Sequence, residues 1–505
     1  MTVNKRFIAG FATGIILFLF IILFLDLQPG KPAVTITLAI AVWMAAWWIF
    51  EVVPLAVTAL LPVILFPLFG VMDGKMVSSA YFNDIIFLFM GGFLIALAMQ
   101  KWLLHKRLAL HILLVSGVSQ GRLLAGFMIA TAFLSMWISN TAAAMMMIPI
   151  AISILDQMEN NLEKKASQKL SVGLLLGIAY SASVGGIATL VGTPPNLAFA
   201  RIYSISFPGA PEISFGQWMV FAMPLSLFFL VMIWIYLYFL FCRSKKRANV
   251  SDTPVYVKGA LIKLGKPGFE EKVVLIVFLL FAVSLVFRTD ILIGEFRIPG
   301  WSNLFPVPAF INDGTIAIML GVTLFLIPAK KHNDYILDWE TARSLPWKII
   351  ILFGGGFALA EGFIVSGLSE WIGLSLEITA GFHPLIIIIC ITGLMIFLTE
   401  FTSNTATAQM ILPIMAALSV SVKIHPLLFM LPATLAGSMA FMLPVATPPN
   451  AIIFATNRIR IPDMAKNGLM LNFIGIVIIS LVVWFYGRFV FGINMELLPD
   501  WVTYH

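Results

Sequence analysis

A short polar motif that interrupts an apolar segment occurs twice in this chain and restricts its fold more than any other feature. The two copies are Ser139-Asn140-Thr141 and Ser403-Asn404-Thr405, and each continues through an apolar run into a Pro-Ile pair. A Gly-Gly-Phe motif before each copy and a Thr-Pro-Pro-Asn motif after it repeat in the same order, at Gly91, Gly355, Thr193 and Thr447. Internal repeats with apolar segments interrupted by glycine or proline are typical of secondary transporters.

Composition places these repeats in a membrane. Of the 505 residues, 60% are hydrophobic and 11% are charged, whereas charged residues make up about a quarter of a soluble domain. Many apolar runs approach the ~20 residues that cross the hydrocarbon core of a bilayer. The sequence therefore predicts an all-α integral membrane protein surrounded by lipid. The net charge is +7, and the basic residues cluster in short loops beside the apolar runs. This distribution favours a role in orienting the protein in the membrane over nucleic-acid binding.

The apolar runs predict about 11 transmembrane helices. They lie at about 7–25, 33–50, 55–69, 85–99, 170–191, 218–241, 273–287, 314–327, 349–365, 427–446 and 469–490. Two further segments, about 123–155 and 385–420, carry the repeated motif and are expected to break at their centres. If both are re-entrant hairpins, the basic clusters fall on one side of the membrane, as the positive-inside rule requires: 101–107, 164–169, 243–247, 330–331 and 458–460.

This count fixes an expected topology. The amino terminus is cytoplasmic, the carboxy terminus is extracellular, and the first hairpin opens from the cytoplasm. The helix before each hairpin runs in opposite directions in the two repeats, which are therefore inverted relative to each other. Inverted repeats around a central site are the architecture expected for alternating access.

The motifs have the chemistry of an ion and anion site. Non-helical backbone at membrane depth persists only where it is buried in protein or lines a water-filled cavity. Ser135 and Ser139 are spaced to share one helix face, and Thr399 and Ser403 repeat that spacing. Each hydroxyl pair, with the following asparagine and carbonyls left unpaired by the facing Thr-Pro-Pro break, can ligate a hard cation such as sodium. Helix amino-terminal ends at the same place favour anions.

Two observations weigh these interpretations. The four motif windows contain no Lys, Arg or His, so a dianion held there needs compensating charge, which bound sodium ions would supply. A lone Ser or Thr in a membrane helix usually bonds the carbonyl four residues earlier, but paired and repeated hydroxyls favour a site.

Glu400 has no counterpart in the first repeat, because Met136 takes its place. An intramembrane carboxylate is a functional candidate, and a local structural partner is an equal alternative.

Other classes of protein fit less well. An enzyme needs a nucleophile, a base or a metal cluster, and the expected spans contain no His, Glu and Asp set with ligand spacing. We therefore expect a protein that is not an enzyme and has no organic cofactor. A channel stays open as an alternative, and saturable uptake would exclude it.

With these motifs the chain resembles the divalent anion:sodium symporter family, the INDY-type dicarboxylate transporters. The resemblance covers nearly the whole chain and includes Trp47-Trp48-Ile49-Phe50-Glu51 and the segment from Asn83 to Gly92. Phe50 stands where the family usually has threonine, away from the expected site. The resemblance implies a homodimer in the plasma membrane, in which a scaffold domain holds the subunits and a transport domain with both hairpins moves as an elevator.

The resemblance also implies a division of the chain. Residues 1–84 would be scaffold, and 85–242 would be repeat 1 with a hairpin and a broken span. Residues 243–347 would add a linker and two scaffold spans, and 348–505 would be repeat 2.

Residue by residue, the resemblance implies two kinds of contact. The substrate carboxylates would be held by Ser139, Asn140, Thr141, Ser403, Asn404 and Thr405, in a pocket lined by Thr193, Pro194, Thr447 and Pro448. About two sodium ions would bind, one at Ser135, Ser139, Asn140 and Gly192 and the other at Thr399, Ser403, Asn404 and Ala446. The implied activity is sodium-coupled symport of succinate, malate, fumarate or 2-oxoglutarate. Sodium-independent dicarboxylate exchange, and a citrate or sulfate carrier of the same fold, stay open as alternatives.

Overall fold

The computed structural model describes residues 5–117, 119–159, 164–243, 253–293, 296–331, 334–494 and 498–502. Helices make up most of these residues, which confirms the predicted all-α class. From the amino terminus the chain forms α1 (Lys5–Phe24), α2 (Pro32–Phe50), α3 (Leu55–Thr58), α4 (Leu61–Leu68), α5 (Gly74–Ser79), α6 (Asp84–Lys101) and α7 (Leu104–Ser116).

The first repeated motif interrupts a pair of helices. The chain continues with α8 (Gln120–Ser135), α9 (Asn140–Glu159), α10 (Lys164–Ile187), α11 (Pro194–Ser206) and α12 (Phe215–Leu237), which ends in a π-helical turn at Tyr238–Cys242. The predicted break at the centre of the first Ser-Asn-Thr segment is therefore observed between α8 and α9. The basic cluster expected at 243–247 lies, after Arg243, outside the described residues.

The connection between the repeats has more structure than expected. It contains α13 (Thr253–Leu264), α14 (Phe269–Val286), the antiparallel strands β1 (Ile291–Ile293) and β2 (Phe296–Ile298), 3-10 turns at Trp301–Leu304 and Pro308–Phe310, α15 (Asp313–Leu326) and α16 (Trp339–Ala342). The linker before residue 272 contains α13, and the segment from 288 to 310 contains β1 and β2.

The second repeat follows the same order as the first. It comprises α17 (Trp347–Ser366), α18 (Leu368–Ser375), a 3-10 turn (Glu377–Gly381), α19 (Pro384–Thr399), α20 (Asn404–Ser421), α21 (Leu427–Ala436), α22 (Pro448–Ala455), α23 (Ile461–Val482), a π-helical turn (Val483–Gly487) and α24 (Arg488–Val490). The expected span 427–446 is shorter than predicted, because α21 ends at Ala436 and non-helical backbone follows to Thr447.

The run expected as one span at 55–69 is two helices. Pro62 lies in the first turn of α4 and has no N–H to offer the carbonyl four residues earlier, which favours a break between α3 and α4 at this point. The Tyr81 hydroxyl donates to the carbonyl of Ala59, inside this break, at 2.5 Å. The break therefore has its own polar partner.

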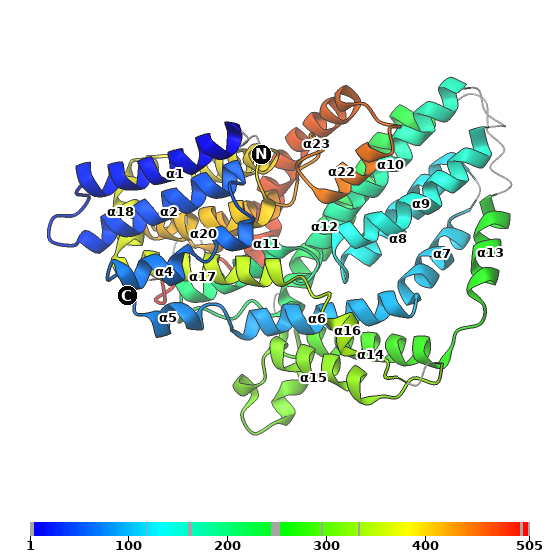
Figure 1. The fold of residues 1–505 in the computed structure, drawn as a ribbon, viewed down its shortest axis with the longest axis horizontal. Helices are drawn as coiled ribbons and strands as arrows, with labels where there is room; N and C mark the ends of the chain where they lie inside the picture. The colour runs from blue at the N-terminus through cyan, green and yellow to red at the C-terminus, as the bar shows by residue number, and fades with distance from the viewer. Residues whose placement is uncertain are drawn as a thin grey trace.

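The two halves of the chain pack in corresponding ways. We call α8 and α9 hairpin 1, and α19 and α20 hairpin 2. The first helix of each hairpin packs on the interrupted helix of its own repeat, α8 on α10 and α19 on α21. The second helix also reaches the other repeat, since α9 packs on α22 and α20 on α11. In Figure 1, α8 and α9 lie side by side in the right-hand part, and α20 lies in the left-hand part.

The repeated Gly-Gly-Phe motifs are points of close helix contact. A Cβ on Gly91 of α6 would lie 2.2 Å from the carbonyl carbon of Ala317 on α15. A Cβ on Gly355 of α17 would lie 2.3 Å from the carbonyl oxygen of Ala59. Neither helix could approach its neighbour so closely with a side chain at that position.

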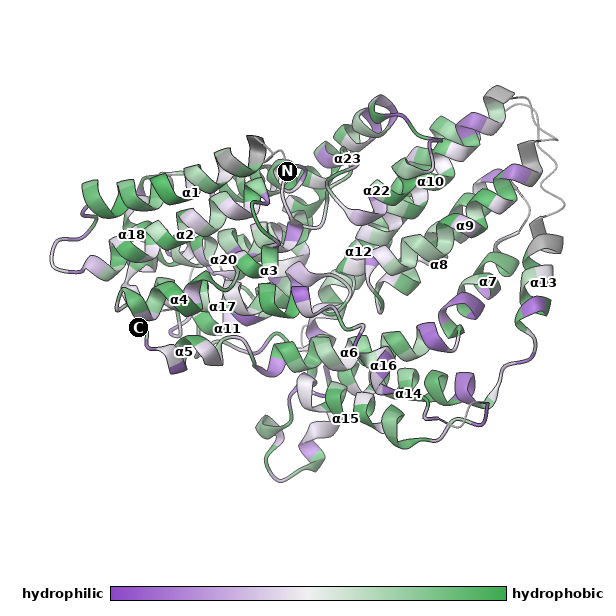
Figure 2. Ribbon diagram, in the orientation of Figure 1, coloured by the Kyte–Doolittle hydropathy of each residue, from purple (hydrophilic) through white to green (hydrophobic). Residues whose placement is uncertain are grey.

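Most of the helical ribbon has the green of hydrophobic residues (Figure 2). Within the described residues, six helices are long and apolar enough to cross a membrane: Pro32–Phe50, Gly74–Lys101, Ala166–Ile187, Phe215–Cys242, Trp347–Ser366 and Ile461–Val490. Several other expected spans correspond to shorter apolar helices, among them Ala9–Phe24, Leu55–Leu68, Asp313–Leu326 and Leu427–Ala436.

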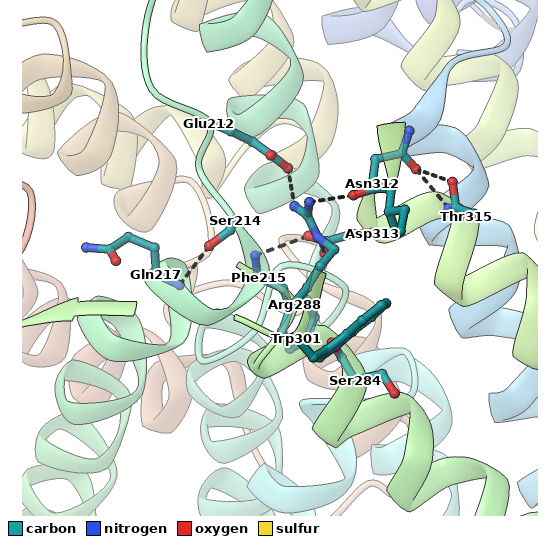
Figure 3. A network of polar contacts seen from close by, with 11 residues as sticks. Glu212, Ser214, Phe215, Gln217, Ser284, Arg288, Trp301, Asn312, Asp313 and Thr315 are labelled. Carbon is teal, nitrogen blue, oxygen red and sulfur yellow. Dashed lines mark hydrogen bonds and ion pairs between the residues drawn. The ribbon is translucent and has the colours of Figure 1, made fainter. Parts of the chain in front are cut away.

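An ionic network, buried at Arg288 and Asp313 and exposed at Glu212, joins α12 to α14 and α15 (Figure 3). Arg288, 2% exposed, follows α14 and is paired with Glu212 and with Asp313, whose Oδ1 accepts from Nε at 2.5 Å. The other oxygen of Asp313 accepts from the backbone N–H of Phe215 at 3.1 Å, in the first turn of α12. The network therefore fixes the start of α12 against the connection between the repeats.

Candidate functional site

The tip of hairpin 1 places a serine against an asparagine. The Ser135 hydroxyl, fully buried at the end of α8, lies 2.5 Å from Oδ1 of Asn140 and 2.6 Å from the carbonyl oxygen of Ala182 on α10. Ser139 lies outside both helices, and its hydroxyl accepts from the N–H of Ala142 at 3.2 Å. Ser135 and Ser139 therefore do not share a helix face, because α8 ends at Ser135.

Four oxygen atoms converge beside Asn140. Its Oδ1 position lies 3.2 Å from the carbonyl oxygen of Ala182 and 3.2 Å from that of Gly192, in addition to the Ser135 hydroxyl. If the amide is turned end for end, its nitrogen donates to these oxygens. Turned in this way, the amide satisfies all three neighbouring oxygens, and a bound cation would instead need the amide oxygen to face them. A Cβ on Gly186 would lie 2.7 Å from Oδ1, so only glycine leaves room for this cluster.

Hairpin 2 repeats this arrangement. The buried Thr399 hydroxyl lies 2.5 Å from Oδ1 of Asn404 and 3.1 Å from the carbonyl oxygen of Gly437, just after α21. Ser403, like Ser139, lies in the break and not on the preceding helix. In both repeats, therefore, the last hydroxyl of the first hairpin helix meets the first asparagine of the second helix and a carbonyl near the end of the facing helix.

The loops that face the tips are held by asparagines to which sequence reasoning gave no role. We call residues 188–193 loop 1 and residues 437–447 loop 2. Asn196 donates from Nδ2 to the carbonyls of Gly186 at 3.3 Å and Thr189 at 2.7 Å. Asn450 donates to those of Ala440 at 3.0 Å and Leu443 at 3.1 Å. The repeated Thr-Pro-Pro-Asn motif was the sequence signal for this role, because its asparagine recurs together with the two prolines in both repeats.

The contact between hairpin and loop differs between the repeats. In repeat 1, the Thr189 hydroxyl donates to the carbonyl of Met136 at 2.5 Å and accepts from the N–H of Gly192 at 3.0 Å. In repeat 2, the residue corresponding to Met136 is Glu400. Its carboxylate accepts a hydrogen bond from Asn472 Nδ2 at 2.8 Å. It also accepts from three successive backbone N–H groups of loop 2, those of Phe441, Met442 and Leu443, at 2.8 to 3.1 Å. Glu400 thus has local structural partners, which was one of the two alternatives considered because repeat 1 has no corresponding carboxylate.

The predicted residues differ in accessibility. Gly192, Thr193, Thr405, Ala446 and Thr447 are buried. The half-buried residues are Ser139, Asn140, Thr141, Ser403, Asn404 and Pro194. Pro448 is exposed. Gly192 lies beside Asn140 at the tip of hairpin 1, and Tyr180 of α10 links the two repeats by donating to the carbonyl of Phe441 at 3.1 Å.

A cavity of about 630 Å³ lies away from these tips. It is lined by Arg288, Asp290, His425 and Trp501, among others, and none of the predicted site residues lines it. Burial lowers the pKa of His425 to about 4, so this imidazole is neutral at pH 7. Because none of the predicted site residues lines it, the cavity is separate from the two clusters at the hairpin tips.

Two interrupted helix pairs, with hydroxyl, amide and carbonyl groups gathered where the helices stop, are typical of an integral membrane transporter. The chain belongs to the family described as the sodium:sulfate symporter transmembrane region, whose profile matches residues 8–493. This membership confirms the predicted multi-pass membrane protein and the expectation of a transporter and not an enzyme.

Curated relatives match almost the full chain. The sodium-dependent dicarboxylate transporter SdcS of Staphylococcus saprophyticus is 45% identical over 502 residues, which cover 97% of this chain and 94% of that protein. SdcS of Staphylococcus aureus is 45% identical over 504 residues, with 98% and 94% covered.

Two solved structures share the fold at low identity. The YdaH transporter of Alcanivorax borkumensis aligns with a TM-score of 0.55 at 13% identity, covering 83% of this chain and 88% of its own. MtrF of Neisseria gonorrhoeae aligns with a TM-score of 0.54 at 12% identity, covering 82% and 85%. These similarities concern the fold alone.

Proposed function

We propose that this protein is a secondary active transporter that moves C4 and C5 dicarboxylates, such as succinate, malate, fumarate and 2-oxoglutarate, across the plasma membrane by sodium-coupled symport. The names of its relatives support the substrate class and the coupling ion. The observation that carries the proposal is the repeated cluster at the hairpin tips, where a hydroxyl, an amide oxygen and helix-end carbonyls converge. Neutral oxygens of these kinds ligate hard cations.

Each repeat would hold one sodium ion. In repeat 1 the ligands would come from Ser135, Ser139, Asn140 and Gly192, and in repeat 2 from Thr399, Ser403, Asn404 and Ala446. The contacts of Ser135 and Thr399 support this assignment, since each hydroxyl is already beside its asparagine and a backbone carbonyl. The carbonyls of Ala182 and Gly437 are further candidates for the same ions.

The substrate would lie between the two ions. Four helices begin at the repeated motifs: α9 at Asn140, α20 at Asn404, α11 at Pro194 and α22 at Pro448. Helix amino termini present free N–H groups and a partial positive charge, which favour carboxylates. Ser139-Asn140-Thr141 and Ser403-Asn404-Thr405 would therefore each hold one carboxylate, and Thr193, Pro194, Thr447 and Pro448 would line the pocket.

Alternating access would come from an elevator movement. The scaffold would comprise residues 1–84 and 243–347, and the moving parts would lie in 85–242 and 348–505. The corresponding packing of the two hairpins supports inverted repeats. We also propose a homodimer, which the resemblance to the family implies, and a cytoplasmic amino terminus with an extracellular carboxy terminus, which the charge distribution along the sequence supports.

Uptake of radiolabelled succinate by proteoliposomes tests the proposal. A sodium gradient should drive succinate into empty vesicles, and potassium alone should not. Asn140→Ala and Asn404→Ala should each abolish uptake while keeping the thermal unfolding profile of the wild type. Normal uptake by either variant would contradict the site assignment. Uptake that requires preloaded succinate and ignores sodium would establish an exchanger, and failure with succinate but success with citrate or sulfate would change the substrate.

A further inference from the structure

We infer that Tyr180 couples the two sodium sites, so that an ion in one repeat raises the affinity of the other. The inference rests on the proposed function, because it requires two ions. It concerns a positioning residue: Tyr180 touches neither cluster, and it acts through the groups that form them.

Tyr180 makes a buried contact between residues of the two repeats that are far apart in sequence. Its side chain is fully buried on α10, and its hydroxyl donates to the carbonyl of Phe441 in loop 2 at 3.1 Å. The two rings also meet edge to face, with centroids 4.9 Å apart. A buried phenolic hydroxyl needs a partner, so the position of loop 2 depends on that of α10.

On one side, Tyr180 is two residues before Ala182 in the same helix. The carbonyl of Ala182 lies 2.6 Å from the Ser135 hydroxyl and 3.2 Å from the Asn140 amide. A cation held by these oxygens would fix this part of α10, and the Tyr180 hydroxyl with it.

On the other side, Phe441 leads to the second cluster. Its backbone N–H donates to Glu400 at 2.8 Å, and Glu400 directly follows Thr399, whose hydroxyl lies 2.5 Å from Oδ1 of Asn404. A chain of covalent and polar contacts therefore connects Asn140 to Asn404 through Tyr180 and Glu400.

The chain transmits a change because water cannot replace its contacts. Ser135, Tyr180, Phe441, Glu400 and Thr399 are each at most 1% exposed. An unpaired polar group at such depth costs free energy, so a shift at one end is passed on and not absorbed by solvent. Coupling between two binding sites is reciprocal, and typical values change affinity about 5- to 150-fold.

Tyr180→Phe removes one hydroxyl and keeps the ring against Phe441. The readout of coupling is sodium binding to the purified protein without succinate, followed by sodium-dependent thermal stabilisation. For the wild type we expect a Hill coefficient above 1 and up to about 2, the limit for two sites, and for Tyr180→Phe about 1 with the half-saturating sodium concentration raised about fivefold. Uptake requires both ions and is therefore sigmoidal in sodium even without coupling; it serves to show that uptake at saturating sodium is retained. Tyr486→Phe is the matched control, because that hydroxyl also donates to a backbone carbonyl, that of Val220 at 2.7 Å, outside this chain of contacts.

A double-mutant cycle separates coupling from general loosening. With Ser135→Ala, which weakens the first site, Tyr180→Phe should cause no further change in sodium affinity. Wild-type cooperativity in Tyr180→Phe would overturn the inference, as would the same loss in Tyr486→Phe. A wild-type Hill coefficient of about 1 would overturn it too and leave sodium-driven uptake standing, whereas a wild type with no sodium-driven uptake would overturn the proposed function itself.

Discussion

Asn196 and Asn450 make the same pair of hydrogen bonds in the two repeats. Each donates its side-chain amide to the carbonyls ten and seven residues earlier, Gly186 and Thr189 in one case and Ala440 and Leu443 in the other. Both asparagines are fully buried. The amide thus closes the loop between the two halves of an interrupted helix, where backbone donors are missing because two prolines precede it.

Removal of either amide should collapse the loop that it closes. Asn196→Ala removes the donor to three carbonyls, those of Gly186, Ile187 and Thr189, and Asn450→Ala removes the donor to two, at a cost of about 1–3 kcal/mol per buried group left unpaired. We expect succinate uptake to fall at least about tenfold and thermal unfolding to shift to lower temperature. Asn312→Ala removes a half-buried asparagine that caps α15 and should keep uptake near wild type. Unchanged uptake in both loop variants would show that neither loop needs its amide.

The hydroxyls at the ends of α8 and α19 should control sodium affinity separately from substrate affinity. Ser135→Ala and Thr399→Val each delete a hydroxyl that lies beside an asparagine oxygen. We expect the half-saturating sodium concentration to rise about tenfold or more, because a neutral ligand is lost, with succinate affinity kept at saturating sodium. Thr399→Ser restores the hydroxyl and should restore sodium affinity. A loss in Thr399→Ser equal to that in Thr399→Val would mean that shape, and not the hydroxyl, matters there.

Glu400 should be needed for the conformation of loop 2. Glu400→Leu would leave three adjacent N–H groups without an acceptor, and we expect a loss of several kcal/mol in stability, seen as poor recovery of folded protein. Glu400→Gln keeps an oxygen acceptor, and its amide can donate to Oδ1 of Asn472, which has no partner in the described structure. Thermal unfolding should therefore rank the wild type and Glu400→Gln well above Glu400→Leu. Equal stability of the leucine and glutamine variants would contradict this role.

The ion pair of Arg288 and Asp313 gives a prediction about stability alone. Arg288→Met leaves a buried carboxylate without its cation, which typically costs about 3–5 kcal/mol. Adding Asp313→Asn removes the charge and keeps an oxygen for the N–H of Phe215. The double variant should therefore unfold at a higher temperature than Arg288→Met. A double variant as unstable as the single one would show that the arginine acts through its packing.

Local signals in the sequence were sufficient for the helical breaks and for the class of protein. The Ser-Asn-Thr and Thr-Pro-Pro motifs predicted where helices stop, because asparagine and proline act on the backbone around them. The contacts of individual side chains, in contrast, depend on packing between residues that are far apart in the sequence. The contact of Tyr180 with Phe441 joins residues 261 positions apart, and no pattern of spacing predicts it.

Two local expectations also failed for physical reasons. Ser135 and Ser139 were placed on one helix face by their spacing, but α8 ends at Ser135. The run at 55–69 read as one span, although Pro62 divides it.

The contact of Gly91 with Ala317 has a practical consequence for measuring motion. Two helices whose backbones touch cannot slide past each other without separating first, so α6, although it belongs to repeat 1, stays with α15 of the proposed scaffold, and the two helices form a single reference. A spectroscopic label on the exposed side chain of Met319 would therefore report on both helices. Distances from such a label to one at the exposed Phe401, beside the tip of hairpin 2, would show how far the tip travels during a transport cycle.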